Sequence, residues 1–127
     1  MKIYDCFTYF DEKMLLNFRL NYLNNYVDKF VISEANYTHS GKPKKLNFNI
    51  DDYPKFKDKI IYIKLDKLPN FSKADLFSER TKSIKIISYQ RNKLLEGLSE
   101  ADKNDFVIYS DCDEIPNIKA LNFSFLK

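Results

Sequence analysis

Two aspartates, Asp111 and Asp113, have the spacing and the setting of a metal-binding turn. They follow the apolar run from Phe106 to Tyr109, which is typical of a short buried strand. Two carboxylates in a partly dry turn repel each other, and a bound cation relieves that repulsion. Oxygen ligands suit Mg²⁺ or Mn²⁺, which often take one or two carboxylates together with substrate phosphates. Such a cation stabilises a nucleoside diphosphate as a leaving group, as glycosyl transfer from a nucleotide sugar requires.

An Asp-x-Asp pattern is weak on its own, because aspartate is common in turns for local hydrogen-bonding reasons. Its place directly after a strand favours the functional interpretation, since open α/β sheets bind ligands at the carboxyl ends of their strands. A phosphotransferase of the haloacid-dehalogenase type also has Asp-x-Asp after a strand, but there the motif opens the domain and precedes Thr or Val. Here Glu114 follows and the motif lies late in the sequence, which disfavours that alternative.

The rest of the sequence alternates between short apolar runs and helical spacing. We expect strands over residues 3–10, 29–33, 59–65 and 105–110, with a further short strand over 46–50. We expect helices over 12–25, with Asp11 as the N-cap, and over 83–98. Residues 51–57 predict one or two helical turns, and 66–82 a loop with a short helix. This order predicts an α/β fold of parallel βαβ units flanked by helices.

Polar residues follow two of the predicted strands, Glu34 after one and the acidic turn after the other, so both should lie at one edge of the sheet. Arg91 falls on the apolar side of its predicted helix, and a half-buried arginine needs a partner. That partner is either a bound diphosphate or an acid of the turn. We favour a structural ion pair that orients Asp113 or Glu114. His39 is interpreted as a surface loop residue.

Composition narrows the function classes. The 127 residues fit one domain, and the net charge of +3 comes from scattered lysines, which disfavours nucleic-acid binding. Cys6 and Cys112 form no CxxC pair, which excludes a zinc ribbon and favours two buried thiols in a reducing cytosol. No apolar run reaches the roughly 18 residues of a membrane-spanning helix. The N-terminal residues have no signal-peptide pattern.

Four blocks of the sequence, in order, resemble glycosyltransferase family 17, the β-1,4-mannosyl-glycoprotein β-1,4-N-acetylglucosaminyltransferase family. They are residues 4–7 with the helical segment 16–23, residues 27–44, residues 90–92 and residues 107–116. The resemblance implies a GT-A-like (Rossmann-like) fold, of which this chain is the N-terminal nucleotide-binding half. It also implies inverting transfer of N-acetylglucosamine from UDP-N-acetylglucosamine to a mannosyl-containing glycan, as in N-glycan processing.

The same resemblance suggests site residues. Asp111 and Asp113 would hold Mn²⁺ or Mg²⁺, and Asp111 would also belong to the diphosphate site, where Arg91 is a further candidate. From the strand ends we infer that other residues lie near the nucleotide, namely Glu34, Asn36 and the 41–43 loop with Lys42. Glu34 would accept hydrogen bonds from the ribose or the base. The alternative for Glu34 is a solvated loop carboxylate.

Two departures qualify the resemblance: the sequence has no Trp, and it stops at Lys127, whereas family members continue well beyond this point. The acceptor-binding half and the catalytic base are expected beyond Lys127. We therefore expect a single nucleotide-sugar-binding domain over residues 1–127, truncated at its C-terminus, with a donor and a glycan acceptor as partners. The alternative is a truncated or degenerate domain that binds the nucleotide sugar without catalysis. A cytoplasmic location is expected, and membrane association stays open.

Overall fold

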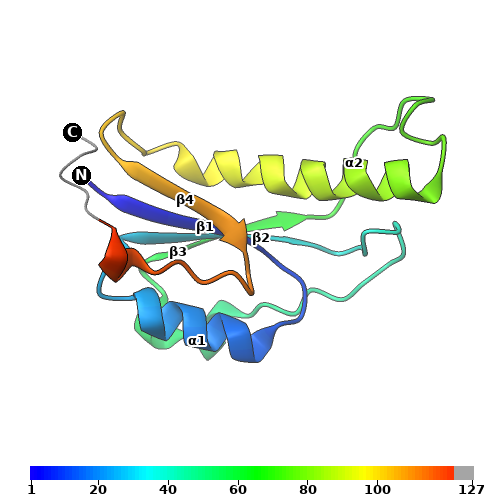
Figure 1. Ribbon diagram of the computed structural model, residues 1–127. Helices are drawn as coiled ribbons and strands as arrows, with labels where there is room; N and C mark the ends of the chain where they lie inside the picture. Colours follow the sequence, from blue (N-terminus) through cyan, green and yellow to red (C-terminus); the bar gives the residue numbers. More distant parts are fainter. Residues whose placement is uncertain (122–127) are drawn as a thin grey trace.

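The computed structural model describes residues 1–121, which form a four-stranded, all-parallel sheet with a helix on each face (Figure 1). The strand order is β3-β2-β1-β4. The strands are β1 Ile3–Tyr9, β2 Lys29–Ala35, β3 Ile60–Leu65 and β4 Phe106–Asp111. The α-helices are α1 Lys13–Leu23 and α2 Glu79–Asn92. This confirms the predicted α/β class and is consistent with a Rossmann-like domain. No helix in this part of the chain is long and apolar enough to cross a membrane.

Short 3-10 helices complete the described chain. They are η1 Ile50–Asp52, η2 Pro54–Phe56, η3 Lys93–Leu98 and η4 Ile118–Ala120. The first two confirm the helical turns expected over residues 51–57. The third continues α2 directly, so the helix predicted over residues 83–98 is an α-helix that tightens into 3-10 form in its last turns.

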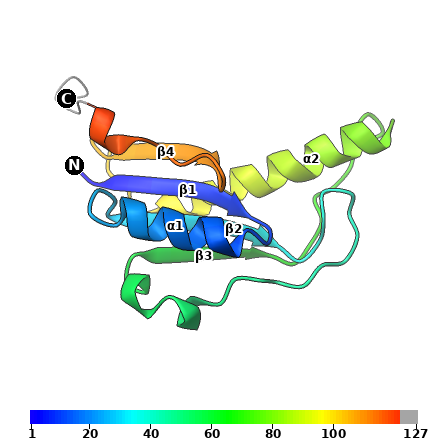
Figure 2. The same cartoon turned by 60° about the horizontal axis from the view of Figure 1, so that its bottom comes forward.

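Side chains of the central strands are buried on both faces because α1 covers one face and α2 with η3 the other (Figure 2). Phe7 packs with Leu16 and Leu20 on the α1 side. Cys6 and Val31 pack on the η3 side. There η3 lies so close to β2 that a Cβ on its glycine, Gly97, would meet Val31 Cγ1 at 2.3 Å. Glycine is therefore required for this packing rather than merely tolerated at the end of a helix.

Besides the end of β2, which extends to Ala35, three details of the predicted elements are wrong. The long helix begins at Glu79 rather than 83, because Ser78 caps it: its hydroxyl accepts a hydrogen bond from the Thr81 N–H, and the Thr81 hydroxyl accepts one from the Ser78 N–H. Asp11 is not the N-cap of α1; Glu12 occupies that position without a capping bond. Residues 46–50 form no strand, and the N–H groups of Asn47 and Phe48 donate to the Glu34 carboxylate rather than to a neighbouring strand.

The direction of winding reverses between β1 and β4. The chain runs outward from β1 through α1 to β2 and on to β3, and α2 then returns it to the opposite side of β1. Thr8 pairs with Asp111 at the carboxyl ends of these two strands. Open α/β sheets bind ligands in the crevice at such a switch point, so the topology alone selects the β1 and β4 ends as the place for a site.

Candidate functional site

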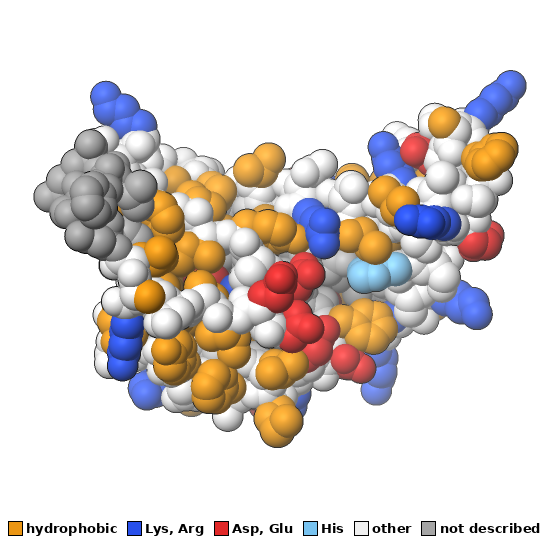
Figure 3. All heavy atoms as spheres, in the orientation of Figure 1, with side chains coloured by type: hydrophobic (Ala, Val, Ile, Leu, Met, Phe, Trp, Pro, Cys, Tyr) orange, Lys and Arg blue, Asp and Glu red, His pale blue; other side chains and the backbone are white. Residues whose placement is uncertain are grey.

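A cavity of about 330 Å³ opens at this switch point. It is lined by residues from the β1 end, the α2 C-terminal half and the β4 end, with one from the loop after β2: Thr8, Tyr9, Phe10, Glu12, His39, Ile87, Gln90, Arg91, Asp111, Cys112 and Asp113. In Figure 3, Asp and Glu side chains gather in the middle of the face, with a histidine and a basic side chain beside them. The volume is at the lower end of the range of small-molecule pockets.

The acidic turn is the carboxylate-bearing wall of this cavity. Asp111 is the last residue of β4, and the turn closes where the Glu114 N–H donates to Asp111 O at 2.9 Å. The Asp111 N–H donates to Glu114 Oε1 at 2.9 Å, so the Glu114 carboxylate folds back onto the turn. Asp113 is exposed, whereas Cys112 between the two aspartates is buried. Both aspartates line the cavity, and the sequence-predicted pair is thus brought to one site.

The thiol between the aspartates is inert. Burial raises the pKa of Cys112 to about 12, and burial also raises the pKa of Cys6 to about 12. Both cysteines are free and buried, as expected from their spacing. A thiol that stays protonated at neutral pH is a poor nucleophile, which leaves the carboxylates as the reactive groups of this wall.

Arg91 is half-buried and pairs with an acid of the turn, as predicted. Its side chain is 46% exposed, and it lies beside the inward-facing residues of α2, Ile86 and Gln90. The acid it pairs with is Asp111, with Arg91 Nη2 at 3.5 Å from Asp111 Oδ1, rather than Asp113 or Glu114. The guanidinium also lies over the Tyr109 ring, 5.7 Å from its centroid. The cavity therefore has a cation on the α2 side facing carboxylates on the β4 side.

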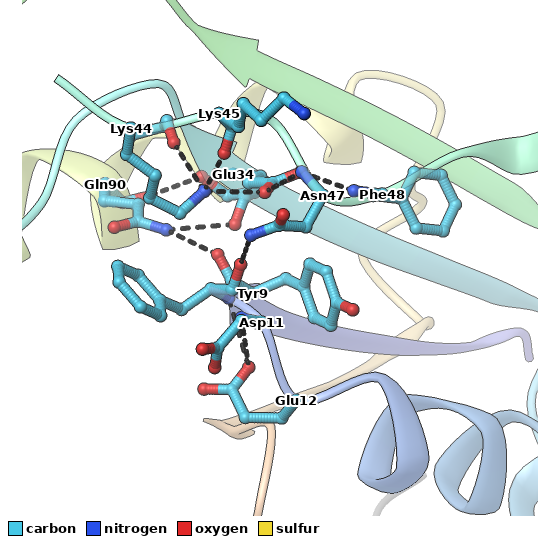
Figure 4. A network of polar contacts seen from close by, with 12 residues as sticks. Tyr9, Asp11, Glu12, Glu34, Lys44, Lys45, Asn47, Phe48 and Gln90 are labelled. Carbon is cyan, nitrogen blue, oxygen red and sulfur yellow. Dashed lines mark hydrogen bonds and ion pairs between the residues drawn. The ribbon is translucent and has the colours of Figure 1, made fainter.

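Glu34 lies inside β2 rather than after it, and it is fully buried, so the solvated-loop alternative is wrong. Oε1 accepts hydrogen bonds from the Phe48 N–H at 3.0 Å and the Tyr62 hydroxyl at 2.7 Å. Oε2 accepts from Lys44 Nζ at 2.8 Å and the Asn47 N–H at 2.7 Å (Figure 4). All four bonds are to protein groups, and Glu34 does not line the cavity.

The Glu34 network reaches the cavity indirectly. Asn47 Nδ2 donates to Phe10 O at 2.6 Å, and Glu12 Oε2 accepts from the Phe10 N–H at 3.1 Å. Lys44 Nζ lies 5.1 Å from the centroid of the Phe10 ring. Phe10 lines the cavity, and these contacts hold its backbone N–H, its backbone carbonyl and its ring.

The other predicted nucleotide residues lie apart from the main cavity. Asn36 lines a separate hollow with Gly41 and Pro43, and Lys42 is exposed on the same loop. His39 is exposed, which confirms the surface-loop interpretation, and it also lines the main cavity. Of the residues predicted for the site, the structure brings together Asp111, Asp113 and Arg91 in one cavity. A nucleotide contact by Glu34, Asn36 or Lys42 stays a prediction.

Two buried polar residues of the site were missed from the sequence. Gln90 is 5% exposed, and its Nε2 donates to Ser33 O at 3.0 Å and Tyr9 O at 3.5 Å, which ties α2 to the ends of β2 and β1. Arg19 is fully buried in α1 and donates to backbone carbonyls of the acidic turn. The sequence pattern that could have indicated a buried position for Arg19 is its helical spacing with Leu16 and Leu23.

The protein supplies only part of a cation shell. Within residues 1–121, no group of three or more His, Cys, Asp or Glu side chains is arranged to hold a metal ion. Mg²⁺ usually keeps several waters and binds through one or two carboxylates plus substrate phosphates. Asp111 and Asp113 on an open cavity wall fit that mode, in which the substrate completes the shell.

Comparison with known proteins identifies the family of the chain. Neither the curated proteins nor the solved structures contain a match to the chain. The family model described as glycosyltransferase family 17 matches residues 1–126, nearly the whole sequence, including the acidic turn and all of the cavity residues. The chain belongs to glycosyltransferase family 17.

Proposed function

We propose that this glycosyltransferase chain binds UDP-N-acetylglucosamine with Mn²⁺ or Mg²⁺ in the switch-point cavity, for inverting transfer of N-acetylglucosamine to a mannosyl-containing glycan. The observation that carries the proposal is the pairing, in one cavity, of Asp111 and Asp113 with the opposing cation Arg91. A nucleotide diphosphate presents anionic oxygens that match both a carboxylate-held cation and a guanidinium. A GT-A-like fold is part of the same proposal.

Each wall of the cavity has a part in this proposal. Asp111 and Asp113 hold the divalent cation, which supplies charge stabilisation to the departing diphosphate. Arg91 donates to a phosphate oxygen and is free to turn, since it is half exposed and its ion pair with Asp111 is long at 3.5 Å. Phe10 lies at the β1 end of the cavity with its side chain exposed, and its ring offers a flat surface to the nucleoside.

Glu34 has a supporting part. Because its carboxylate is used by Lys44, Asn47 and Phe48, we propose that it shapes the cavity through the segment that holds Phe10. Inverting transfer also needs a general base that takes the proton from the attacking hydroxyl of the acceptor glycan.

Calorimetry with UDP-N-acetylglucosamine tests the proposal, with and without Mn²⁺, on the wild type and on Asp113→Ala. We expect binding that requires Mn²⁺, and at least a ten-fold loss of affinity in Asp113→Ala, because one of two protein ligands is removed. Asp58→Ala is the matched control: Asp58 is exposed and lies before β3, away from the cavity, so the affinity should be unchanged.

The outcomes separate the alternatives. Absence of binding by the wild type with Mn²⁺ present contradicts the proposal. Binding of equal strength without the cation contradicts the role given to Asp111 and Asp113. Binding without transfer to mannosyl acceptors favours the alternative, a nucleotide-sugar-binding domain without catalysis of its own.

A further inference from the structure

The acidic turn is held from the interior by Arg19 of α1, whose side chain has no exposed surface. Its Nη1 donates to Asp111 O at 2.7 Å and Glu114 O at 3.0 Å, with a longer contact of 3.3 Å to Cys112 O. Its Nη2 donates to Ser110 Oγ at 2.6 Å, and that hydroxyl donates to Glu114 O at 2.8 Å. One guanidinium thus fixes the backbone on both sides of the two aspartates.

The opposite side of the guanidinium is fixed by Asp5 of β1, which is also fully buried. Arg19 Nε donates to Asp5 Oδ2 at 2.8 Å, and Nη2 donates to Asp5 Oδ1 at 2.7 Å. The guanidinium carbon lies 4.3 Å from the centroid of the Phe7 ring. The planar guanidinium of Arg19 donates hydrogen bonds to Asp5 on one side and to the acidic turn on the other. A lysine ammonium, with three donors on one nitrogen, cannot reproduce this geometry.

A buried ion pair is weak support for stability, because apolar residues of similar volume often replace such a pair at little or no cost. What apolar residues do not provide is donors for the carbonyls of Asp111, Cys112 and Glu114. Those carbonyls belong to a turn that leaves the sheet, and the backbone hydrogen bond that closes this turn runs from the Glu114 N–H to Asp111 O. The specific contribution of the pair is therefore to the shape of the turn.

We propose that Arg19, oriented by Asp5, is the positioning residue of the site: it sets the conformation of residues 110–114 so that Asp111 and Asp113 face the cavity. The use of that conformation to bind cation and nucleotide rests on the proposed function. The effect of Arg19 on the conformation of the turn does not depend on the proposed function.

The test is the double variant Asp5→Leu/Arg19→Met, which replaces the ion pair by apolar side chains. We expect it to stay folded by circular dichroism, while its affinity for UDP with Mn²⁺ falls at least ten-fold. Amide hydrogen exchange followed by NMR should accelerate at least ten-fold in residues 111–114 and stay unchanged in the rest of the sheet. Lys59→Met is the matched control, since Lys59 Nζ also donates to two backbone carbonyls, at 2.7 and 3.0 Å, but far from the turn.

The proposal is overturned if the folded double variant keeps the affinity of the wild type within two-fold and the turn exchanges at its original rate. If the double variant does not fold, the same two measurements are made on Arg19→Lys. This variant keeps the positive charge beside Asp5 and lacks the guanidinium donors. If the wild type does not bind UDP with Mn²⁺, the proposed function fails, and hydrogen exchange of the turn alone decides the role of Arg19.

Discussion

Replacing Glu34 by Gln removes the charge from the buried carboxylate while keeping its size, and we expect a large loss of stability. The glutamine amide has one oxygen and can accept only two of the four hydrogen bonds, so the orientation of the amide decides which two are kept. Its oxygen should take the place of Oε2, beside the Lys44 ammonium and the Asn47 N–H. The amide nitrogen then faces the two Oε1 partners, the Tyr62 hydroxyl and the Phe48 N–H. The Tyr62 hydroxyl can rotate and accept a hydrogen bond from the amide nitrogen, whereas the Phe48 N–H is a donor only and loses its acceptor.

The size of the stability loss in Glu34→Gln follows from those contacts. Lys44 is left without its counter-charge at a side chain that is only 7% exposed, and breaking a buried pair in this way costs about 3–5 kcal/mol. The Phe48 N–H, left without an acceptor, is part of that loss rather than an addition to it, because contributions in one network are not additive. Domains of this kind have unfolding free energies of about 5–15 kcal/mol, so the variant should lose a large share of its stability.

Urea unfolding at 25 °C, followed by circular dichroism because the chain has no Trp, measures this loss. The double variant Glu34→Gln/Lys44→Met removes both charges and should recover part of the stability. A loss below about 1 kcal/mol in the single variant, the size of an ordinary neutral hydrogen bond, would refute the reasoning. Nucleotide binding by the folded fraction separates the two roles considered for Glu34: a direct ligand would lose affinity well beyond what unfolding accounts for.

Two further predictions concern the interior. Gly97→Ala should destabilise the fold by about 1–3 kcal/mol in urea unfolding, because the added methyl overlaps Val31; Val31→Ala in the same chain should relieve part of the loss, and an additive double variant would contradict the clash. Burial raises the pKa of Cys6 and Cys112 from 9.0 to about 12, so both thiols stay protonated in the folded state and stability should fall as the pH rises above 9. At pH 8 both thiols should react with a disulfide reagent far more slowly than in urea, and equally fast reaction would show that they are accessible.

The order of elements and the acidic turn were predictable because each rests on a local signal. The apolar run before Asp111 has the length of a buried strand, and the alternation of strands and helices leaves few topologies open. The sheet order β3-β2-β1-β4 then confirms that Glu34 and the acidic turn lie at the same edge. Boundaries were less accurate: β2 extends to Ala35, which moves Glu34 from a loop into the sheet.

Which arginine is buried was not predictable from helical spacing alone. Arg91 was assigned to the apolar side of its helix, although α2 has only a narrow buried face, with Ile86 and Gln90 on it. Arg19 has the same kind of spacing among leucines and is the buried one. The difference lies in the partners: Asp5 faces Arg19 from β1, a pairing between residues 14 positions apart that depends on how α1 lies across the sheet.

The charges buried in residues 1–121 have a common use. Arg19 holds the turn after β4, and Glu34 holds the segment 44–48, which donates to the wall of the same cavity through Asn47. Neither segment is part of a strand, and each has few backbone hydrogen bonds, such as Glu114 N–H to Asp111 O and Lys44 N–H to Asn36 O. Both segments border the cavity or support its wall. Apolar packing is non-directional and does not specify the path of such a segment, whereas a charged side chain with several donors or acceptors does. The buried charges therefore define the shape of the site, and the sheet and its apolar core define only where the site lies.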